Sequence, residues 1–172
     1  MQEPVLRAIS FAARAHDGQR RKDGATPYAA HPCRVLFILR SVFGVEDADT
    51  LTAAALHDTI EDTTVDRDDV IEEFGERVAS FVALLSKDKR LPEKEREDRY
   101  FEQLASAPIE VRLCKLGDTL DNLIDGASLK PSARAKGVRT ARRVLDVLGP
   151  DWPTEWIEVF RTVEAEVTRL EN

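Results

Sequence analysis

The apolar residues of PIEVRLCKLGDTLDNLIDGA, residues 108–127, repeat with the period of an α-helix over about five turns. They form one continuous stripe, made of Ile109, Leu113, Leu116, Leu120, Leu123 and Ala127. On a helical wheel at about 100° per residue, Asp118 lies opposite this stripe, with Lys115 and Asn122 beside it. We therefore expect a long helix with one face in the core and the other facing something polar.

The same period recurs along the rest of the chain, separated by short segments rich in glycine and proline. From His31 onward the apolar positions continue to Val42, so His31 begins an inward-facing stripe. No alternation of strands and helices, internal repeat or dividing linker is found. The sequence thus predicts an all-α protein, and a length of 172 residues favours a single domain over residues 1–172.

Composition narrows the class of protein. Hydrophobic residues make up 42% and charged residues 33%, as in soluble globular proteins. A net charge of −7 argues against a nucleic-acid binder, and the apolar runs are too short to cross a membrane. No leader pattern is present and Cys33 and Cys114 are far apart, so we expect a cytoplasmic protein with reduced thiols. The local basic stretch RRK, residues 20–22, is sufficient for a phosphate-bearing small molecule.

The segment LHDTIEDT, residues 56–63, places one histidine and three acids directly after the apolar run LTAAAL. We expect one helix through LTAAALHDTIED, with Thr50 as its N-cap. On such a helix His57 and Asp58 point about 100° apart and can share one ion beyond the helix surface. Glu61 and Asp62 then follow on the same side, where a general base orients or deprotonates water.

His31 and Asp118 lie on other predicted helices and face inward or toward a cleft. Two histidines and two carboxylates suit a divalent ion such as manganese, and the lack of a cysteine cluster disfavours structural zinc. The simpler interpretation stays open, because a histidine near a core is more often a hydrogen-bonded structural residue. Likewise, the acids and the basic loop are often only solvated surface.

Five motifs, in the same order, resemble the HD-domain hydrolases of the RelA/SpoT group, most of all the small alarmone hydrolases and metazoan SpoT homologues. They span Ala15 to Leu123 and read AHDGQRRKDGATPYAAHP, ALHDTIEDT, FGERVASFV, LP…R and KLGDTLDNL. The resemblance implies an HD-type helical bundle and a manganese-dependent hydrolase that removes the 3′-pyrophosphate from guanosine tetra- or pentaphosphate.

The resemblance also implies roles for individual residues. The metal ligands of the family match His31, His57, Asp58 and Asp118. The pair that handles the attacking water matches Glu61 and Asp62. The basic pair near the nucleotide base matches Arg21 and Lys22, and the asparagine near the ribose matches Asn122. His16, in AHDGQ, matches a family position that is not a ligand, so we interpret it as structural.

Three departures from the family pattern leave alternatives open. Family members commonly read KLADRLHN or KLADKLYN where this chain has Gly117 and Asp121, and an acid at 121 close to Asn122 could repel a phosphate. The segment LPEKERED carries acids at 93, 97 and 98, namely Glu93, Glu97 and Asp98. One alternative is therefore a phosphohydrolase of another nucleotide, such as a phosphorylated dinucleotide cofactor. The other is a non-catalytic HD module that senses a nucleotide. The oligomeric state is not predicted.

Overall fold

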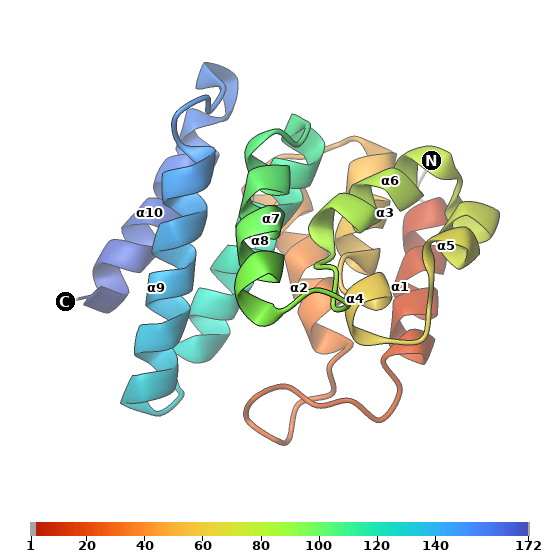
Figure 1. Ribbon diagram of the computed structural model, residues 1–172, viewed down its shortest axis with the longest axis horizontal. Helices are drawn as coiled ribbons and strands as arrows, with labels where there is room; N and C mark the ends of the chain where they lie inside the picture. Colours follow the sequence, from red (N-terminus) through yellow and green to blue (C-terminus); the bar gives the residue numbers. More distant parts are fainter. Residues whose placement is uncertain (1–2, 172) are drawn as a thin grey trace.

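The computed structural model describes residues 3–171, which fold into helices joined by short loops (Figure 1). Within these residues there is no β-strand, and a single isolated bridge pairs Arg20 with Pro27. The all-α class expected from the sequence is therefore confirmed. The elements are α1 (Glu3–Ala15), α2 (Ala30–Phe37), the π-helical turn η1 (Ile38–Val42), α3 (Ala48–Leu56), α4 (Thr59–Asp62), α5 (Arg67–Phe74), α6 (Glu76–Leu85), α7 (Glu93–Ala105), α8 (Ile109–Gly126), α9 (Pro131–Leu148), the 3₁₀ turn η2 (Thr154–Trp156) and α10 (Ile157–Glu171).

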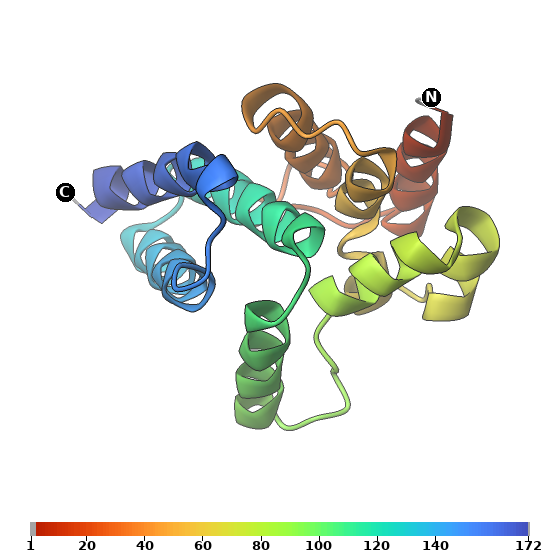
Figure 2. The same ribbon diagram turned by 90° about the horizontal axis from the view of Figure 1, so that it is seen from above.

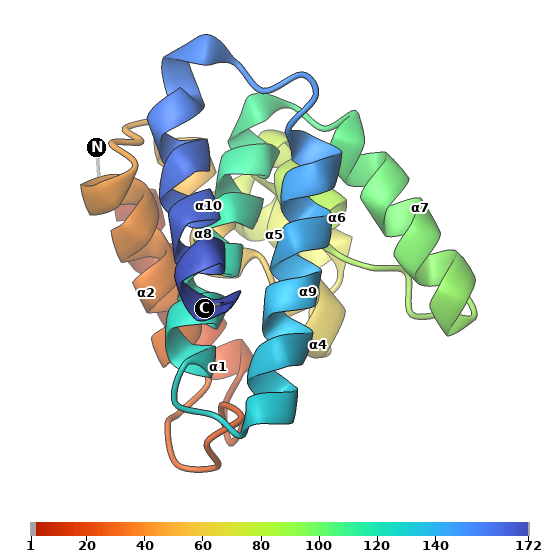
Figure 3. The same ribbon diagram turned by 90° about the vertical axis from the view of Figure 1, so that its left-hand side faces the viewer.

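Helix α8 is the central element of the fold. It contacts α2, α3, α6, α9 and α10, and Figure 2 shows it between the α9–α10 pair and the N-terminal helices. The middle of its apolar stripe, from Leu113 to Leu123, is buried as expected, but so are several polar side chains on other sides of the helix. Helix α7, in contrast, lies at the edge of the molecule (Figures 2 and 3). Acids on α8 are consequently held in the interior, where they need partners.

A close helix contact explains the glycine at position 117. A Cβ atom built on Gly117 would overlap the Cδ1 atom of Leu39 and would lie 3.4 Å from Cγ1 of Val35. Both neighbours are fully buried, so neither has free space into which it can move. Glycine in a helix interior costs about 1 kcal/mol relative to alanine, and here it allows η1 and α2 to pack directly on the α8 backbone.

The helix expected through LTAAALHDTIED is interrupted at the His-Asp pair, so the expectation of one continuous helix was wrong. Helix α3 ends at Leu56 and α4 begins at Thr59. The Thr59 hydroxyl donates to the Leu56 carbonyl at 2.7 Å, and His57 Nδ1 donates to the Ala54 carbonyl at 2.8 Å. These side chains satisfy carbonyls near the end of α3, which makes the break inexpensive.

The N-cap of α3 differs from the one expected from the sequence. Thr50 is not the N-cap of α3; the cap is Asp47, whose carboxylate accepts the Thr50 backbone N–H at 2.8 Å. Asp66 caps α5 in a reciprocal arrangement with Asp69. Within residues 3–171, no helix has the length and apolar character needed to cross a membrane.

Candidate metal centre

Four side chains from α2, the α3–α4 junction and α8 converge on one point. The Nε2 atoms of His31 and His57 are 3.2 Å apart. The Asp118 Oδ1 atom lies 3.2 Å from Nε2 of His31 and 3.8 Å from Nε2 of His57. The Asp58 Oδ2 atom lies 3.5 Å from Nε2 of His31 and 3.0 Å from Nε2 of His57. The break between α3 and α4 thus brings His57 and Asp58 together with His31 and Asp118.

Hydrogen bonds on the far side of each imidazole ring set its orientation. His57 Nδ1 donates to the Ala54 carbonyl, and His31 Nδ1 donates to the Asp121 carboxylate at 2.6 Å. Because Nδ1 carries the proton in both rings, each neutral ring presents the lone pair of Nε2 to the shared point. This is the usual arrangement of histidines that bind a metal.

The electrostatics of this cluster favour a positive charge at its centre. Burial alone disfavours the imidazolium form, but the carboxylates of Asp58 and Asp118 raise the pKa of His57 to about 9. Burial likewise opposes ionisation of Asp58, yet the charge of His57 holds the pKa of that carboxyl well below its usual range. Imidazole nitrogens and ionised carboxylate oxygens are donors that suit a divalent cation. Within residues 3–171, His31, His57 and Asp118 form a group that could hold a metal ion, and Asp58 lies beside it.

Two neighbouring residues hold the carboxylates of the cluster. The Tyr28 hydroxyl donates to Asp58 Oδ2 at 2.5 Å, and Lys115 Nζ donates to Asp118 Oδ2 at 2.7 Å. Burial raises the pKa of the Tyr28 phenol, so it stays protonated as a donor. Sequence reasoning missed Tyr28, although its position three residues before His31, in TPYAAHP, was an available signal.

Glu61 and Asp62 lie on α4, just beyond the ligand pair, and both are held by the loop that follows α6. The Glu61 carboxylate accepts the backbone N–H of Lys87 at 2.9 Å, and the Asp62 carboxylate accepts from Lys89 Nζ at 2.6 Å. Burial raises the pKa of Glu61 above its ordinary value of 4.5. A half-buried carboxylate with a raised pKa is suited to accept a proton.

One cavity of about 410 Å³ is bordered by the four converging side chains and by Tyr28, Lys115, Glu61 and Asp62. Basic side chains on its wall come from the loop after α1, the loop after α6 and α8, and the apolar and aromatic part comes from α6 and α7. The lining comprises Arg20, Arg21, Lys22, Tyr28, His31, His57, Asp58, Glu61, Asp62, Leu85, Lys87, Tyr100, Lys115, Asp118, Asn122 and Thr140. An acidic protein therefore has a hollow in which cations face the metal centre, as a phosphorylated ligand requires.

The three residues expected to contact the substrate differ in whether their side chains are already bound by other residues. Arg21 is buried, and its guanidinium donates to Asp125 at 3.0 Å and to Asn122 Oδ1 at 2.9 Å. This guanidinium thus ties its loop to α8. Lys22 is exposed and forms no ion pair within the part of the chain that the structure describes. Asn122 also donates to Asp118, so it joins the basic loop to the metal centre. Their contacts with substrate stay predictions.

His16 lies outside the metal cluster. It is buried, stacks on Tyr28 with ring centroids 4.6 Å apart, and shares a 2.9 Å hydrogen bond with the Gln19 side chain. Gln19 in turn donates to the Asp62 backbone carbonyl at 2.8 Å. The contacts of His16 are those of a residue that supports Tyr28 and the end of α4.

The acids that depart from the family pattern mostly have basic partners. Asp121 is 2% exposed, does not line the cavity, and accepts from His31 and from both Nε and Nη2 of Arg34. Burial opposes its ionisation, but these hydrogen bonds hold the pKa of its carboxyl below the usual range. On α7, Glu97 pairs with Lys87 at 2.8 Å and Asp98 with Arg143 at 3.0 Å. The repulsion of phosphate expected from Asp121 therefore has no support in the geometry.

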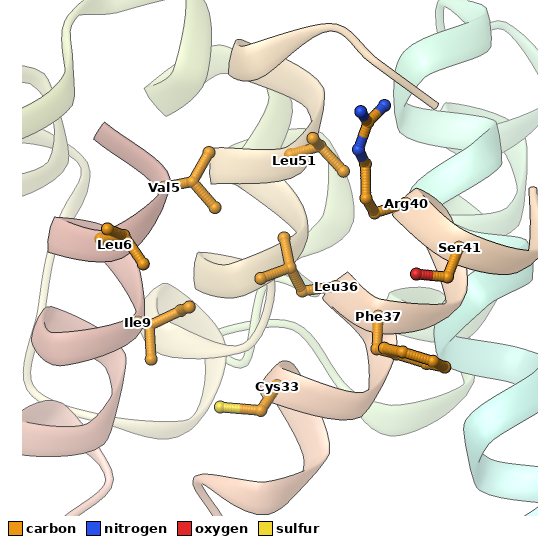
Figure 4. Close-up of a pocket in the computed structure, with 9 residues that line it drawn as sticks. All are labelled: Val5, Leu6, Ile9, Cys33, Leu36, Phe37, Arg40, Ser41 and Leu51. Carbon is orange, nitrogen blue, oxygen red and sulfur yellow. The ribbon is translucent and has the colours of Figure 1, made fainter. Parts of the chain in front are cut away.

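A second hollow, of about 340 Å³, differs in chemistry (Figure 4). It lies between α1, α2, η1 and α3, and its one charged wall residue, Arg40, is paired with Glu46 at 2.9 Å. The remaining lining is mainly apolar: Val5, Leu6, Ile9, Cys33, Leu36, Phe37, Ser41 and Leu51. It contains none of the predicted site residues, so the polar cavity is the candidate site.

Comparison with known proteins agrees with this geometry. The family model described as HD domain matches residues 8–150. The guanosine-3′,5′-bis(diphosphate) 3′-pyrophosphohydrolase MESH1 of Homo sapiens is 44% identical over 122 residues, which are 70% of this chain and 68% of the human protein. The Danio rerio protein of the same name is 34% identical over 164 residues, 95% of this chain and 87% of the relative.

A solved structure extends the likeness to the fold. It is described as a metazoan ortholog of SpoT that hydrolyzes ppGpp and plays a role in starvation responses. Its TM-score is 0.81 at 29% sequence identity, and the match covers 97% of this chain and 93% of the other. The HD-type helical bundle implied by the sequence motifs is thereby confirmed. The chain belongs to the HD domain family and is homologous to the MESH1 and SpoT hydrolases.

Proposed function

We propose that this protein is a metal-dependent hydrolase that removes the 3′-pyrophosphate from guanosine tetraphosphate and pentaphosphate. The observation that carries the proposal is the convergence of two histidines and two carboxylates, next to two further acids, in a cavity with basic walls. The names of the relatives, guanosine-3′,5′-bis(diphosphate) 3′-pyrophosphohydrolase, support the same substrate.

The proposed metal ligands are His31, His57, Asp58 and Asp118, and the proposed ion is Mn²⁺. Such an ion, when bound, lowers the pKa of water and offsets negative charge on phosphate. The hydrogen bonds that hold the four ligands in the protein are those described above, to Ala54, Asp121, Tyr28 and Lys115. They fix the donor atoms before any ion binds, which reduces the cost of ordering the site.

We assign the proton transfer to Glu61, with Asp62 as the residue that orients the attacking water. Glu61 is the more buried of the two and has the raised pKa. Its position is fixed by the Lys87 backbone N–H, so the carboxylate keeps one oxygen for water. In the reaction, water bonds to the 3′-linked phosphorus, Glu61 takes a water proton, and the bond from that phosphorus to the 3′ oxygen breaks. The released 3′ oxygen takes up a proton, which leaves guanosine diphosphate and intact pyrophosphate.

Basic side chains on the cavity wall are available to the other phosphates of the nucleotide. Lys22 is exposed and has no ion-pair partner among the residues that the structure describes. A hollow of about 250 Å³ adjoins the cavity between α8 and α9, with Lys22 and Lys136 on its wall. We propose that Lys22, with Arg21 and Asn122, contacts the nucleotide. The positive charge of Arg21 is already paired with the carboxylate of Asp125. We therefore expect Arg21 to orient the loop more than to attract phosphate.

The test is a product analysis. The protein loaded with Mn²⁺ is incubated with guanosine tetraphosphate in water enriched in heavy oxygen, and the products are separated and weighed by mass spectrometry. We expect guanosine diphosphate without label and pyrophosphate with one labelled oxygen. Release of single phosphates, or label in the nucleotide, would contradict the proposed site of attack.

A panel that includes dinucleotide cofactors with a 2′- or 3′-phosphate tests the first alternative. If only such a cofactor is turned over, the substrate assignment is wrong, whereas the assignment as an HD hydrolase stands. The sensor alternative predicts nucleotide binding without turnover of any substrate. Asp58→Ala serves as the metal-deficient control, because activity that survives in it comes from a contaminating phosphatase.

Three wider expectations stay predictions. They are a single domain over residues 1–172, a cytoplasmic location and a lack of nucleic-acid partners. Limited proteolysis tests the first, because one cooperative domain should yield no stable large fragment. The acidic net charge of −7 remains the argument for the third.

A further inference from the structure

Asp121 is a buried carboxylate behind the metal centre, three residues beyond Asp118 on α8. Its Oδ2 atom accepts from His31 Nδ1 at 2.6 Å and from Arg34 Nη2 at 3.0 Å. Its Oδ1 atom accepts from Arg34 Nε at 2.6 Å. Both oxygens are therefore engaged, and none of them borders the cavity. A buried acid with this geometry needs an explanation, because ionised groups are rarely held at 2% exposure.

We propose that Asp121 is a positioning residue for metal binding: by accepting the Nδ1 proton of His31, it keeps the Nε2 lone pair of that ring directed at the ion. A carboxylate bound to the remote nitrogen also makes the imidazole a stronger electron donor. The inference rests on the metal site of the proposed function and adds a residue that touches neither the ion nor the substrate.

Arg34 and its neighbours explain why an acid can hold this place. The guanidinium of Arg34 bridges Asp121 and Asp125, with Nη2 3.1 Å from Asp125 Oδ1. Arg21 adds a second cation 3.8 Å from Asp121. Two arginines thus balance the two acids, and the planar two-point contact of Arg34 fixes the plane of the Asp121 carboxylate. The plane in turn fixes where His31 Nδ1 must lie.

An amide at this position cannot reproduce both contacts. In Asp121→Asn, an amide oxygen directed at His31 leaves the NH₂ group facing Arg34 Nε, so two donors meet. With the amide turned over, the NH₂ group faces His31 Nδ1, and the ring must then accept there and carry its proton on Nε2. That tautomer has no lone pair for an ion. Both orientations weaken metal binding while the shape of the side chain is kept.

The experiment compares Asp121→Asn with Asp125→Asn. Both variants remove one negative charge from neighbouring turns of α8 beside the same two arginines, but Asp125 makes no contact with His31. Mn²⁺ alone is titrated into each metal-free protein by calorimetry, with circular dichroism as the check on folding. We expect Asp121→Asn to bind Mn²⁺ about 10–100-fold more weakly, and Asp125→Asn to bind nearly as the unchanged protein does. Equal affinities for the two variants overturn the proposal.

A measurement on the unchanged protein keeps the test independent of folding in the variants. The chain has three histidines, so nitrogen NMR can resolve each ring, with Zn²⁺ as a diamagnetic ion in place of Mn²⁺. We expect His31 to carry its proton on Nδ1, with the proton signal of a hydrogen bond to carboxylate. A proton on Nε2 of His31 would refute the inference. Failure of the unchanged protein to bind any divalent ion would instead refute the proposed function.

Discussion

Removal of the metal should lower the thermal stability of the protein by an amount set by ion binding to the native state alone. The cluster exists only in the fold, because it joins α2, the α3–α4 junction and α8. An ion at about 100 times its dissociation constant stabilises the native state by about 2.7 kcal/mol. For a chain of 172 residues, each kcal/mol shifts the melting temperature by about 2–4 °C. We therefore expect Mn²⁺ to raise the melting temperature by about 5–10 °C.

The assay is a thermal melt followed by circular dichroism, with Mn²⁺ added to chelator-treated protein. Asp58→Ala should keep the helical spectrum, because the side chain lies at the cavity and not in the apolar core. If affinity falls hundredfold, the same Mn²⁺ concentration stabilises this variant by only about 0.4 kcal/mol. Asp62→Asn, which removes an acid from the same cavity outside the ligand set, should keep the full shift. An equal shift in Asp58→Ala would show that the ion binds elsewhere.

Further tests concern the other residues of the site and the packing at Gly117. Glu61→Gln and Asp62→Asn should each lower turnover about 10²–10⁴-fold while Mn²⁺ still binds by calorimetry; full activity in the double variant would remove both from the mechanism. Burial raises the pKa of Glu61 above 4.5, so turnover should be lost as the pH falls through that raised pKa; the acid limb of the profile should be absent in Glu61→Gln. Lys22→Ala should raise KM more than it lowers kcat, and an unchanged KM would argue against a substrate contact. Gly117→Ala should lower the free energy of unfolding by about 1–3 kcal/mol because of the overlap with Leu39, and Leu39→Ala should relieve that cost in the double variant, as measured by denaturant titration.

The sequence predicted the helices and the residues of the cluster better than their local geometry. Periodicity along 108–127 identified α8 because a helix buried on one stripe repeats its apolar residues regularly. The break at His57–Asp58 could not be predicted in this way. It depends on hydrogen bonds from Thr59 and His57 to carbonyls of α3, which compete with helix continuation by small energies.

Contacts between residues far apart in the chain also could not be predicted from the sequence. Asp121 looked like a source of repulsion because, on the helix alone, it stands next to Asn122. Its real neighbours, His31 and Arg34, come from about 90 residues earlier in the chain. The same holds for Arg21, whose partners Asp125 and Asn122 lie on α8. Charge patterns in a sequence give the sign of a group but not the group that it meets.

The two departures on α8 are related through helix α2. Gly117 and Asp121 are one turn apart, so they lie on the same face of α8. Gly117 contacts Val35 of α2 and Leu39 of η1. Asp121 contacts His31 and Arg34, which come earlier on α2. A larger residue at 117 would push this segment away from α8. Because the hydrogen bond from His31 to Asp121 is 2.6 Å long, even a small displacement would weaken it. The close packing at Gly117 thus sets the distance at which Asp121, one turn later, can hold His31, a proposed metal ligand.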